Sequence, residues 1–175
     1  MSAQSIIKVA AIRNVQTQDI NTVKELILQM LTDSPHAFGD TLTEAQARTD
    51  TDWSRSVQGM ISLPDHNAFI AFKEQGACGF VAGDAGNPQT PPDTVLVSHL
   101  WVASQQRGTG LGRQLMDAVT KWAMNQNARR IALGVTEMNP NAIKFYEHLG
   151  YIDTGLRFPL RWDETKQIII LGRQL

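Results

Sequence analysis

A glycine-rich turn between an apolar strand pattern and a long amphipathic helix pattern constrains this 175-residue chain more than any other feature. The turn lies in LWVASQQRGTGLGR, residues 100–113, and contains Gly108, Gly110 and Gly112. Glycines let the backbone approach a ligand closely, and successive N–H groups at a helix start form a positive concavity that suits phosphate. The turn therefore predicts a ligand that contains a pyrophosphate group.

The spacing of the turn distinguishes three kinds of phosphate-binding loop. A dinucleotide-binding loop requires G-x-G-x-x-G, but the third glycine position falls on Arg113 or Leu115. A P-loop requires Lys-Ser or Lys-Thr after its last glycine, and no glycine here is followed by either pair. The pattern Q/R-x-x-G-x-G/A fits Arg107-x-x-Gly110-x-Gly112. A plain glycine turn that only joins strand to helix is the alternative at this point.

A second segment follows one strand and one helix later, at residues 139–151 (NPNAIKFYEHLGY). It matches N-x-x-A-x-x-x-Y-x-x-x-G-[FY] at Asn139, Ala142, Tyr146, Gly150 and Tyr151. Together the two segments resemble the acetyl-CoA site of the GNAT superfamily of N-acetyltransferases, in which the first loop binds the CoA pyrophosphate. The resemblance, to a subgroup of bacterial members, extends over the whole chain through SPHAFG (residues 34–39) and RIALGVTEMN (residues 130–139).

Apolar periodicity and turn residues predict a mixed order of strands and helices. We expect strands over residues 6–13, 67–73, 78–84, 94–102, 131–136, 151–160 and 167–171. We expect helices from Thr17 or Asp19 to Pro35, over 43–48, from an Asp52 cap through Met60, over 110–127, and from Pro140 to Leu149 with Gly150 after it. The resemblance implies an α/β (α+β mixed-sheet) fold. Its central twisted sheet has about seven strands and about four flanking helices, in a single domain over residues 1–175.

Composition excludes several other classes. The 16 Lys+Arg against 17 Asp+Glu give a net charge of -1, which argues against an electrostatic nucleic-acid binder. The single cysteine, Cys78, excludes an internal disulfide framework and a multi-cysteine metal site. No apolar run approaches the roughly 20 residues of a membrane-spanning helix. We therefore expect a soluble, cytoplasmic protein that requires no metal, nucleic acid or membrane.

The resemblance implies acetyl-CoA as co-substrate and divides its contacts between a loop and a strand. Backbone N–H groups of the loop bind the pyrophosphate, the strand backbone contacts the pantetheine arm and thioester carbonyl, and the side chain of Asn139 contacts the cofactor. The loop residues are Arg107, Gly108, Thr109, Gly110, Leu111, Gly112 and Arg113, and the strand residues are Leu100, Trp101 and Val102.

The catalytic groups are implied less completely. The family's usual acid for the thiolate sulfur corresponds to Tyr146, whose ordinary pKa of about 10 keeps it protonated at pH 7. Glu137, at a strand end, is a candidate base. His99 is another, because its pKa lies near neutrality. Strand alternation, however, places His99 opposite Leu100 and Val102, which favours a packed histidine. Release of the amine proton to solvent is the third alternative.

The resemblance implies an amine as acceptor, and the sequence does not identify it. Residues 14–66 contain eight acids and three bases, a balance of -5 that favours a cationic amine, and the resemblance places His36, Phe38 and Asp40 on the acceptor loop. The predicted function is transfer of acetyl from acetyl-CoA to a primary amine of a small molecule or a protein, by direct attack through a tetrahedral intermediate. A non-catalytic acyl-CoA-binding sensor is the alternative, because residues 94–102 lack a carboxylate. The resemblance also allows a homodimer through the C-terminal strands.

Overall fold

The computed structural model describes residues 10–175, which form seven strands and five α-helices. The strands are β1 (Ala11–Asn14), β2 (His66–Lys73), β3 (Gly76–Asp84), β4 (Thr94–Val102), β5 (Arg130–Thr136), β6 (Ile152–Leu160) and β7 (Asp163–Gln174). The helices are α1 (Ile20–Asp33), α2 (Leu42–Ala47), α3 (Asp50–Gly59), α4 (Leu111–Asn125) and α5 (Pro140–His148). The expected mixed α/β class and seven-stranded sheet are confirmed, with five helices in place of about four.

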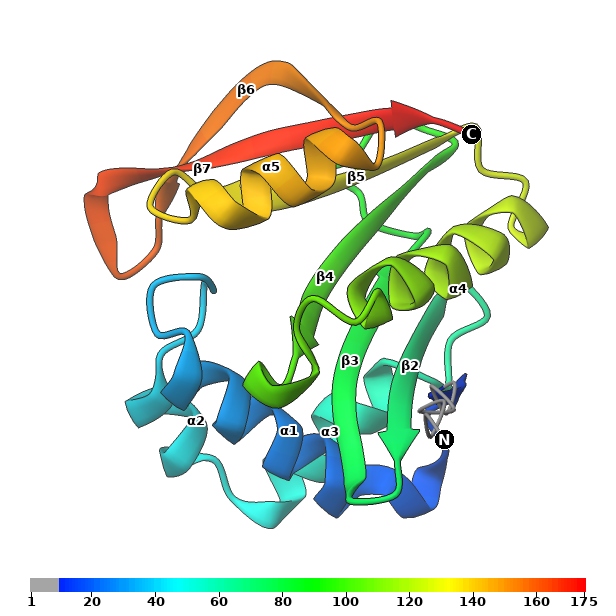
Figure 1. Cartoon of the computed structure of the whole chain (residues 1–175), viewed down its shortest axis with the longest axis vertical. Helices are drawn as coiled ribbons and strands as arrows, with labels where there is room; N and C mark the ends of the chain where they lie inside the picture. The colour runs from blue at the N-terminus through cyan, green and yellow to red at the C-terminus, as the bar shows by residue number, and fades with distance from the viewer. Residues whose placement is uncertain (1–9) are drawn as a thin grey trace, which may run out of the picture.

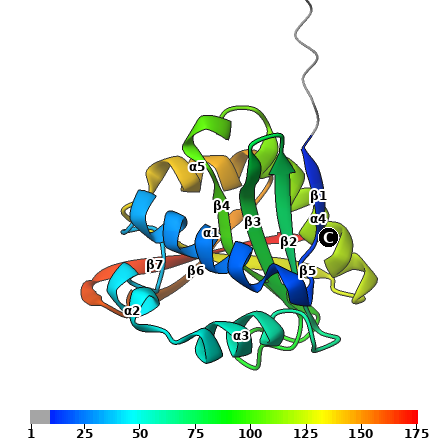
Figure 2. The ribbon, with the colours of Figure 1, turned by 90° about the horizontal axis from the view of Figure 1, so that it is seen from below.

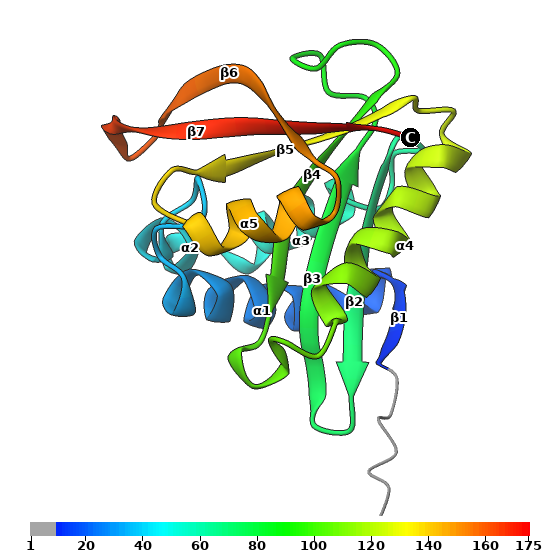
Figure 3. The same ribbon diagram turned by 45° about the horizontal axis from the view of Figure 1, so that its top comes forward.

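The strands form one mixed sheet in the order β1-β2-β3-β4-β5-β7-β6. Neighbouring strands are antiparallel except β4 and β5, which are parallel. Helices α4 and α5 lie on one face of the sheet (Figures 1 and 3), and α1 and α3 lie together on the other (Figure 2). Each face has its own buried cluster. One is centred on α4 residues such as Leu115 and Val119, the other on α1 and α3 residues such as Ile27 and Trp53.

The sheet opens between its two central strands. Strands β4 and β5 pair from Thr94 opposite Arg130 to Val97 opposite Leu133, and no further. Beyond that point β4 continues to Val102 and β5 to Thr136, so the two strands diverge (Figure 1). On this side the peptide groups of Leu100–Val102 therefore have no strand neighbour in the described residues. An acyl chain with amide groups can hydrogen-bond to such an edge.

A bulge interrupts β4 within this part of the strand, just beyond its last pair with β5. Phe80 is opposite Trp101 and Ala82 is opposite Ser98, so two residues of β4 face Val81. One of the two, His99, has a left-handed φ of +57°, which is uncommon for a residue other than glycine. The bulge turns the His99 side chain toward the α1 face of the sheet, where its ring lies 6.2 Å from that of Phe80.

Three local predictions need correction or extension. Asp52 does not begin α3: Thr49 is the N-cap, and its hydroxyl accepts from the Asp52 N–H at 3.2 Å while the Asp52 carboxylate accepts from the Thr49 N–H at 3.0 Å. Strand β7 extends well beyond residues 167–171, because it pairs with both β5 and β6. Of the first expected strand, residues 6–9 lie outside the described part of the chain, and β1 starts at Ala11.

Candidate functional site

The glycine loop turns β4 sharply into α4. Gly108 and Gly110 have φ values of +74° and +84°, a left-handed region that side chains other than glycine rarely adopt. Gly110 is the N-cap of α4, so the next residues form the first turn, whose N–H groups lack intrahelical acceptors. Gly112 faces Phe145 of α5, and a methyl group there would lie 3.2 Å from the ring. The backbone is thus exposed to a ligand between α4 and α5.

A cavity of about 650 Å³ lies between the glycine loop, the end of β4 and α5, and we call it the cofactor cavity. It is lined by ten of the predicted site residues: Leu100, Trp101, Val102, Arg107, Gly108, Gly110, Gly112, Arg113, Asn139 and Tyr146. The side chains of two predicted loop residues point elsewhere. Leu111 is buried in the α4 cluster, and the Thr109 hydroxyl donates to the Gln106 carbonyl at 2.7 Å.

Arg107 links the loop to the opposite wall. Its guanidinium pairs with Asp33 at the C-terminal end of α1, and its Nε–H donates to the Val102 carbonyl at 3.0 Å. The Trp101 indole N–H donates to the same carboxylate at 3.1 Å. Burial opposes ionisation of Asp33, but hydrogen bonds from Arg107, Ser34 and Trp101 outweigh it and lower the pKa of Asp33. The Arg107 N–H donates to the Ser104 carbonyl at 3.3 Å, so among the loop amides this one already has an acceptor.

Helix α5 positions Asn139 and Tyr146, the two motif residues whose side chains can act on a ligand. The Asn139 carbonyl oxygen caps the helix by accepting from the Ala142 N–H at 3.1 Å, which leaves its amide NH₂ group for a ligand. Tyr146 is buried beside Phe145 and Tyr151, with ring centroids 5.3 Å and 5.9 Å away. Burial, and then the neighbouring Tyr151, raise the pKa of Tyr146. The phenol therefore stays protonated and can donate a hydrogen bond.

A second cavity of about 540 Å³ opens on the α1 side of the diverging strands, and we call it the acceptor cavity. Its wall comes from the loop before α2, the loop before β4, and strands β4, β5, β6 and β7. The lining includes the predicted acceptor-loop residues Phe38 and Asp40, but not His36. Gly134 of β5 also lines it, and a methyl group there would come within 2.8 Å of Ile168.

A small cavity of about 70 Å³ lies between the two larger ones and shares wall residues with each, and we call this place the junction. It shares Leu100, Asn139 and Tyr146 with the cofactor cavity, and Ser98 and His99 with the acceptor cavity. The three cavities therefore adjoin one another where β4 and β5 diverge. Tyr146 lies on one side of the junction and His99 on the other.

His99 lies on the strand face that alternation indicates, yet its ring lines a cavity and is not packed in a closed core. Its Nδ1 lies 2.9 Å from the Ser98 hydroxyl. Burial lowers the pKa of His99, Asp40 opposes that effect, and Arg48 adds to it. Glu137 is elsewhere: it is exposed beyond the end of β5, and its carboxylate accepts from the Gln167 N–H at 3.3 Å. Glu137 lines none of the three cavities.

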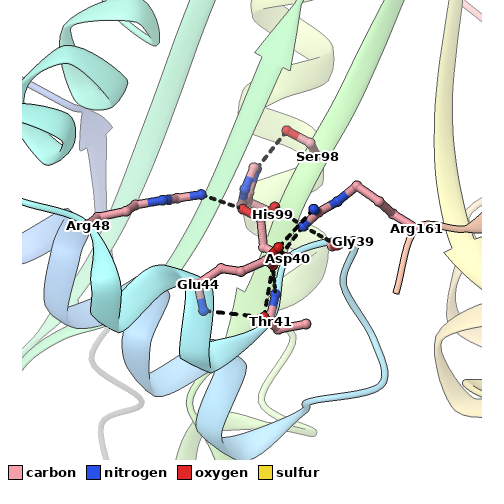
Figure 4. A network of polar contacts seen from close by, with 8 residues as sticks. All are labelled: Gly39, Asp40, Thr41, Glu44, Arg48, Ser98, His99 and Arg161. Atoms are coloured by element: carbon pink, nitrogen blue, oxygen red, sulfur yellow. Dashed lines mark hydrogen bonds and ion pairs between the residues drawn. The ribbon is translucent and has the colours of Figure 1, made fainter. Parts of the chain in front are cut away.

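A charged clasp holds the acceptor loop against the turn between β6 and β7 (Figure 4). Arg161 donates to the Glu44 carboxylate at 2.9 and 2.7 Å and to the Gly39 carbonyl at 3.1 Å. Arg48 and Arg161 approach Asp40 from opposite sides, at 2.9 Å and 3.4 Å. Trp162 beside the clasp donates to the Phe38 carbonyl at 3.0 Å. Sequence reasoning did not single out Arg161 or Trp162, because no local motif marks them.

The acidic balance of residues 14–66 does not produce an acidic cavity. Six of the eight acids in this region contact a guanidinium or ammonium group: Asp19, Asp33, Asp40, Glu44, Asp50 and Asp52. A seventh, Asp65, contacts His66. The charge that favoured a cationic acceptor is therefore largely paired within the protein.

Two further findings concern the described residues 10–175. They contain no group of three or more His, Cys, Asp or Glu side chains placed to hold a metal ion. None of their helices combines the length and the apolar character that crossing a membrane would require.

Known proteins share this sequence pattern and this fold. A model of the Acetyltransferase (GNAT) family matches residues 27–151, which include the glycine loop and the α5 motif. Probable N-acetyltransferase family 8 member 5 of Mus musculus is 29% identical over 135 residues, or 74% of this chain and 55% of the mouse protein. The matched part of the chain thus spans about half the length of that relative.

Solved structures agree in fold. The acetyltransferase of GNAT family from Streptococcus pneumoniae superimposes with a TM-score of 0.78 at 16% identity, covering 95% of this chain and all of the other. A GNAT superfamily phosphinothricin acetyltransferase from Sinorhizobium meliloti, solved in complex with AcCoA, gives 0.75 at 16% identity, covering 95% and 88%. The family match covers more than half of the sequence, and the cavities lie where its two motifs meet. The chain belongs to the Acetyltransferase (GNAT) family.

Proposed function

We propose that this protein transfers an acetyl group from acetyl-CoA to a primary amine by direct attack through a tetrahedral intermediate. The observation that carries the proposal is that the cofactor cavity and the acceptor cavity adjoin at the junction, which Tyr146 and His99 both line. An amine and a thioester that enter from opposite faces of the sheet meet there. Holding two reactants in such a geometry accounts for a large part of many rate accelerations.

The glycine loop and the open edge of β4 support the binding of acetyl-CoA. First-turn N–H groups of α4 and the left-handed Gly108 and Gly110 suit a pyrophosphate. The edge of β4 beyond Val97, which is no longer paired with β5, suits the amides of a pantetheine arm. A backbone N–H at the end of β4, near Val102, would polarise the thioester carbonyl and stabilise the oxyanion, an effect worth about 3 kcal/mol per donor.

Tyr146 is the proposed general acid for the departing thiolate. Its hydroxyl is a donor at neutral pH, because burial raises its pKa. For the base we favour His99 over Glu137, since His99 lines the junction and Glu137 is held at the edge of β7. Burial lowers the pKa of His99, so its ring is neutral at pH 7 and can accept a proton. Apolar surroundings also lower the pKa of a bound amine, which favours proton transfer to the imidazole.

The test combines cofactor binding with turnover. Acetyl-CoA at 100 times its dissociation constant should stabilise the fold by about 2.7 kcal/mol, whereas ATP should not. Thiol release in the presence of an amine would establish transfer, and acetyl-CoA binding with no release from any amine would favour the sensor alternative. Tyr146→Phe should lower kcat by about 100-fold with acetyl-CoA affinity unchanged. Tyr151→Phe is the matched control, because Tyr151 contacts Tyr146 but lines none of the three cavities.

A further inference from the structure

We infer that the acceptor is a primary amine carried on an apolar, otherwise uncharged body, such as an arylalkylamine; the inference rests on the proposed acetyl transfer. Its starting point is the composition of the acceptor cavity wall. Beyond the junction the wall consists mainly of apolar side chains from four strands, including Leu96, Val97, Phe158, Ile168 and Ile170. A volume of about 540 Å³ lies within the range in which proteins enclose small molecules, about 300 to 1,000 Å³.

Charge narrows the class of acceptor further. Among the described residues that line this cavity, Asp40 carries the only formal charge at pH 7 with histidine neutral. That carboxylate is already paired with Arg48 at 2.9 Å and with Arg161 at 3.4 Å. A polyamine or an aminoglycoside needs several unpaired acids, and an amino acid needs a cation for its carboxylate. The cavity wall offers neither unpaired acids nor a cation. Removing a second charged group of the acceptor from water inside this cavity would therefore be costly.

The exposed side chains of β6 point to the same class. Leu156 and Phe158 are 54% and 52% exposed, although both are apolar and both line the cavity. An apolar substrate body lying against them would remove that surface from water, at a gain of about 25 cal/mol per Å². Ile152 on the same strand is 71% exposed but lies outside the cavity. It therefore provides a matched control for any variant of Phe158.

Orientation follows from the two ends of the cavity. At one end, where the cavity meets the junction with Tyr146, it is lined by the polar side chains of Ser98 and His99. A primary amine placed there has an acceptor for its proton and faces the end of β4. The apolar body then extends along β6 and β7 toward Phe158. In this pose the amine of the acceptor lies at the reaction centre, and no polar group of the acceptor lies against the apolar wall along β6 and β7.

The experiment compares three amines that share the phenylethylamine skeleton and differ in charge, together with two cationic amines of other shapes. Acetylation of 2-phenylethylamine, phenylalaninamide, phenylalanine, spermidine and a lysine-containing peptide is followed by thiol release from acetyl-CoA. We expect kcat/KM for 2-phenylethylamine and phenylalaninamide to exceed that for phenylalanine by at least about 100-fold, because only phenylalanine brings a carboxylate. Higher kcat/KM for spermidine, phenylalanine or the peptide would overturn the inference and leave the proposed function intact.

Two variants and a binding measurement test the role of β6 and the case in which no amine is acetylated. Phe158→Ala should raise KM for 2-phenylethylamine about tenfold, with KM for acetyl-CoA unchanged, and Ile152→Ala should change neither. A shift in oligomeric state on size exclusion without a change in KM would identify β6 as a protein interface and overturn the inference. If no amine releases thiol, calorimetry with the CoA-bound protein decides: preferential binding of 2-phenylethylamine over phenylalanine supports the inference, and equal or absent binding overturns it. Loss of acetyl-CoA binding itself would instead overturn the proposed function.

Discussion

The carboxylate of Asp33, at the end of α1, is paired with the guanidinium of Arg107 in the glycine loop. The two residues are 74 positions apart, and the contact connects the helix that borders the acceptor side with the loop that borders the cofactor side. Trp101 donates to the same carboxylate, so the end of β4 is held as well. One carboxylate thus fixes three elements around the cofactor cavity.

Asp33→Asn should lower the free energy of unfolding by about 1 kcal/mol at pH 7, a modest value because Arg107 is 48% exposed and solvent screens the pair. Hydrogen bonds depress the pKa of Asp33 in the folded state. The stabilisation is therefore present above the unfolded pKa of about 3.9 and is lost as pH falls below it. Urea denaturation at pH 7 and at pH 3.5 measures the free energy of unfolding of both proteins at each pH.

Asp50→Asn is the control. Asp50 also forms an ion pair, with Lys24, but its side chain is 94% exposed. A difference from wild type that is independent of pH would contradict the assignment.

Gly110→Ala tests the loop by backbone conformation alone. Nothing lies within 4 Å of the position that an alanine methyl group would occupy, but φ is +84°, so the substitution costs about 1 kcal/mol in backbone strain without a clash. We expect acetyl-CoA to bind about tenfold more weakly by calorimetry, because the first-turn N–H groups of α4 lose their fixed direction. Gly59→Ala is the matched control: it also has open space, without a left-handed φ. Unchanged acetyl-CoA affinity in Gly110→Ala would argue against pyrophosphate binding by this loop.

Much of the cofactor side could be predicted from sequence because its determinants are local. The loop conformation depends on glycines at fixed spacing, and Asn139 and Tyr146 share one short helix, so both patterns can be read within a few residues. The start of α3 is also encoded locally. Thr49 and Asp52 have capping-box spacing, in which the hydroxyl residue is the cap and the acid lies three positions later, so the prediction of Asp52 as the cap was wrong by one turn.

The acceptor side depends on contacts that leave no local signal. Strand alternation assigns His99 the correct face, but only the bulge and the divergence of β4 from β5 show that this face borders a cavity. Arg161 and Glu44 are 117 positions apart and meet only because the β6–β7 turn reaches the loop before α2. The acidic balance of residues 14–66 does not describe the cavity for the same reason, because the partners of these acids include arginines distant in sequence.

The clasp formed by Arg161 should control acceptor binding. Arg161→Ala removes the bidentate contact with Glu44 and the bond to the Gly39 carbonyl, so the loop that lines the acceptor cavity keeps its contacts with Trp162 and Arg48 but is held less firmly. We expect KM for the amine to rise about fivefold with KM for acetyl-CoA unchanged, because a less firmly held loop must be ordered on binding. Hydrogen bonds from Arg161 and Thr41 lower the pKa of Glu44 to about 2, so the effect should be constant from pH 5 to 9.

Arg157→Ala is the matched control for this prediction. Arg157 is also an arginine of the β6–β7 hairpin, but it pairs with Asp153 on its own strand and contacts no residue of the acceptor loop in the described structure. Steady-state kinetics with each substrate varied separately distinguishes the two variants. A rise in KM for acetyl-CoA in Arg161→Ala would show that the clasp acts on the whole fold and not on the acceptor loop.

His99→Gln tests the proposed base through the pH dependence of turnover. With neutral His99 as proton acceptor, kcat/KM for the amine should fall as pH drops through the pKa of His99, which burial holds below its ordinary value near 6.5. The charged groups that act on this ring are Asp40, which raises its pKa, and Arg48, which lowers it, and they oppose each other. His99→Gln should lower kcat/KM by about 100-fold and remove this fall at acidic pH, which we call the acidic limb, with acetyl-CoA affinity unchanged.

His66→Gln is the control. His66 contacts Asp65 and Asp84 away from the cavities, so this substitution should leave the pH profile as in wild type. Persistence of the limb in His99→Gln, or its loss in Glu137→Gln, would assign the base elsewhere. Loss of the limb in His99→Gln alone would place proton acceptance at the junction, where the strand bulge directs this side chain.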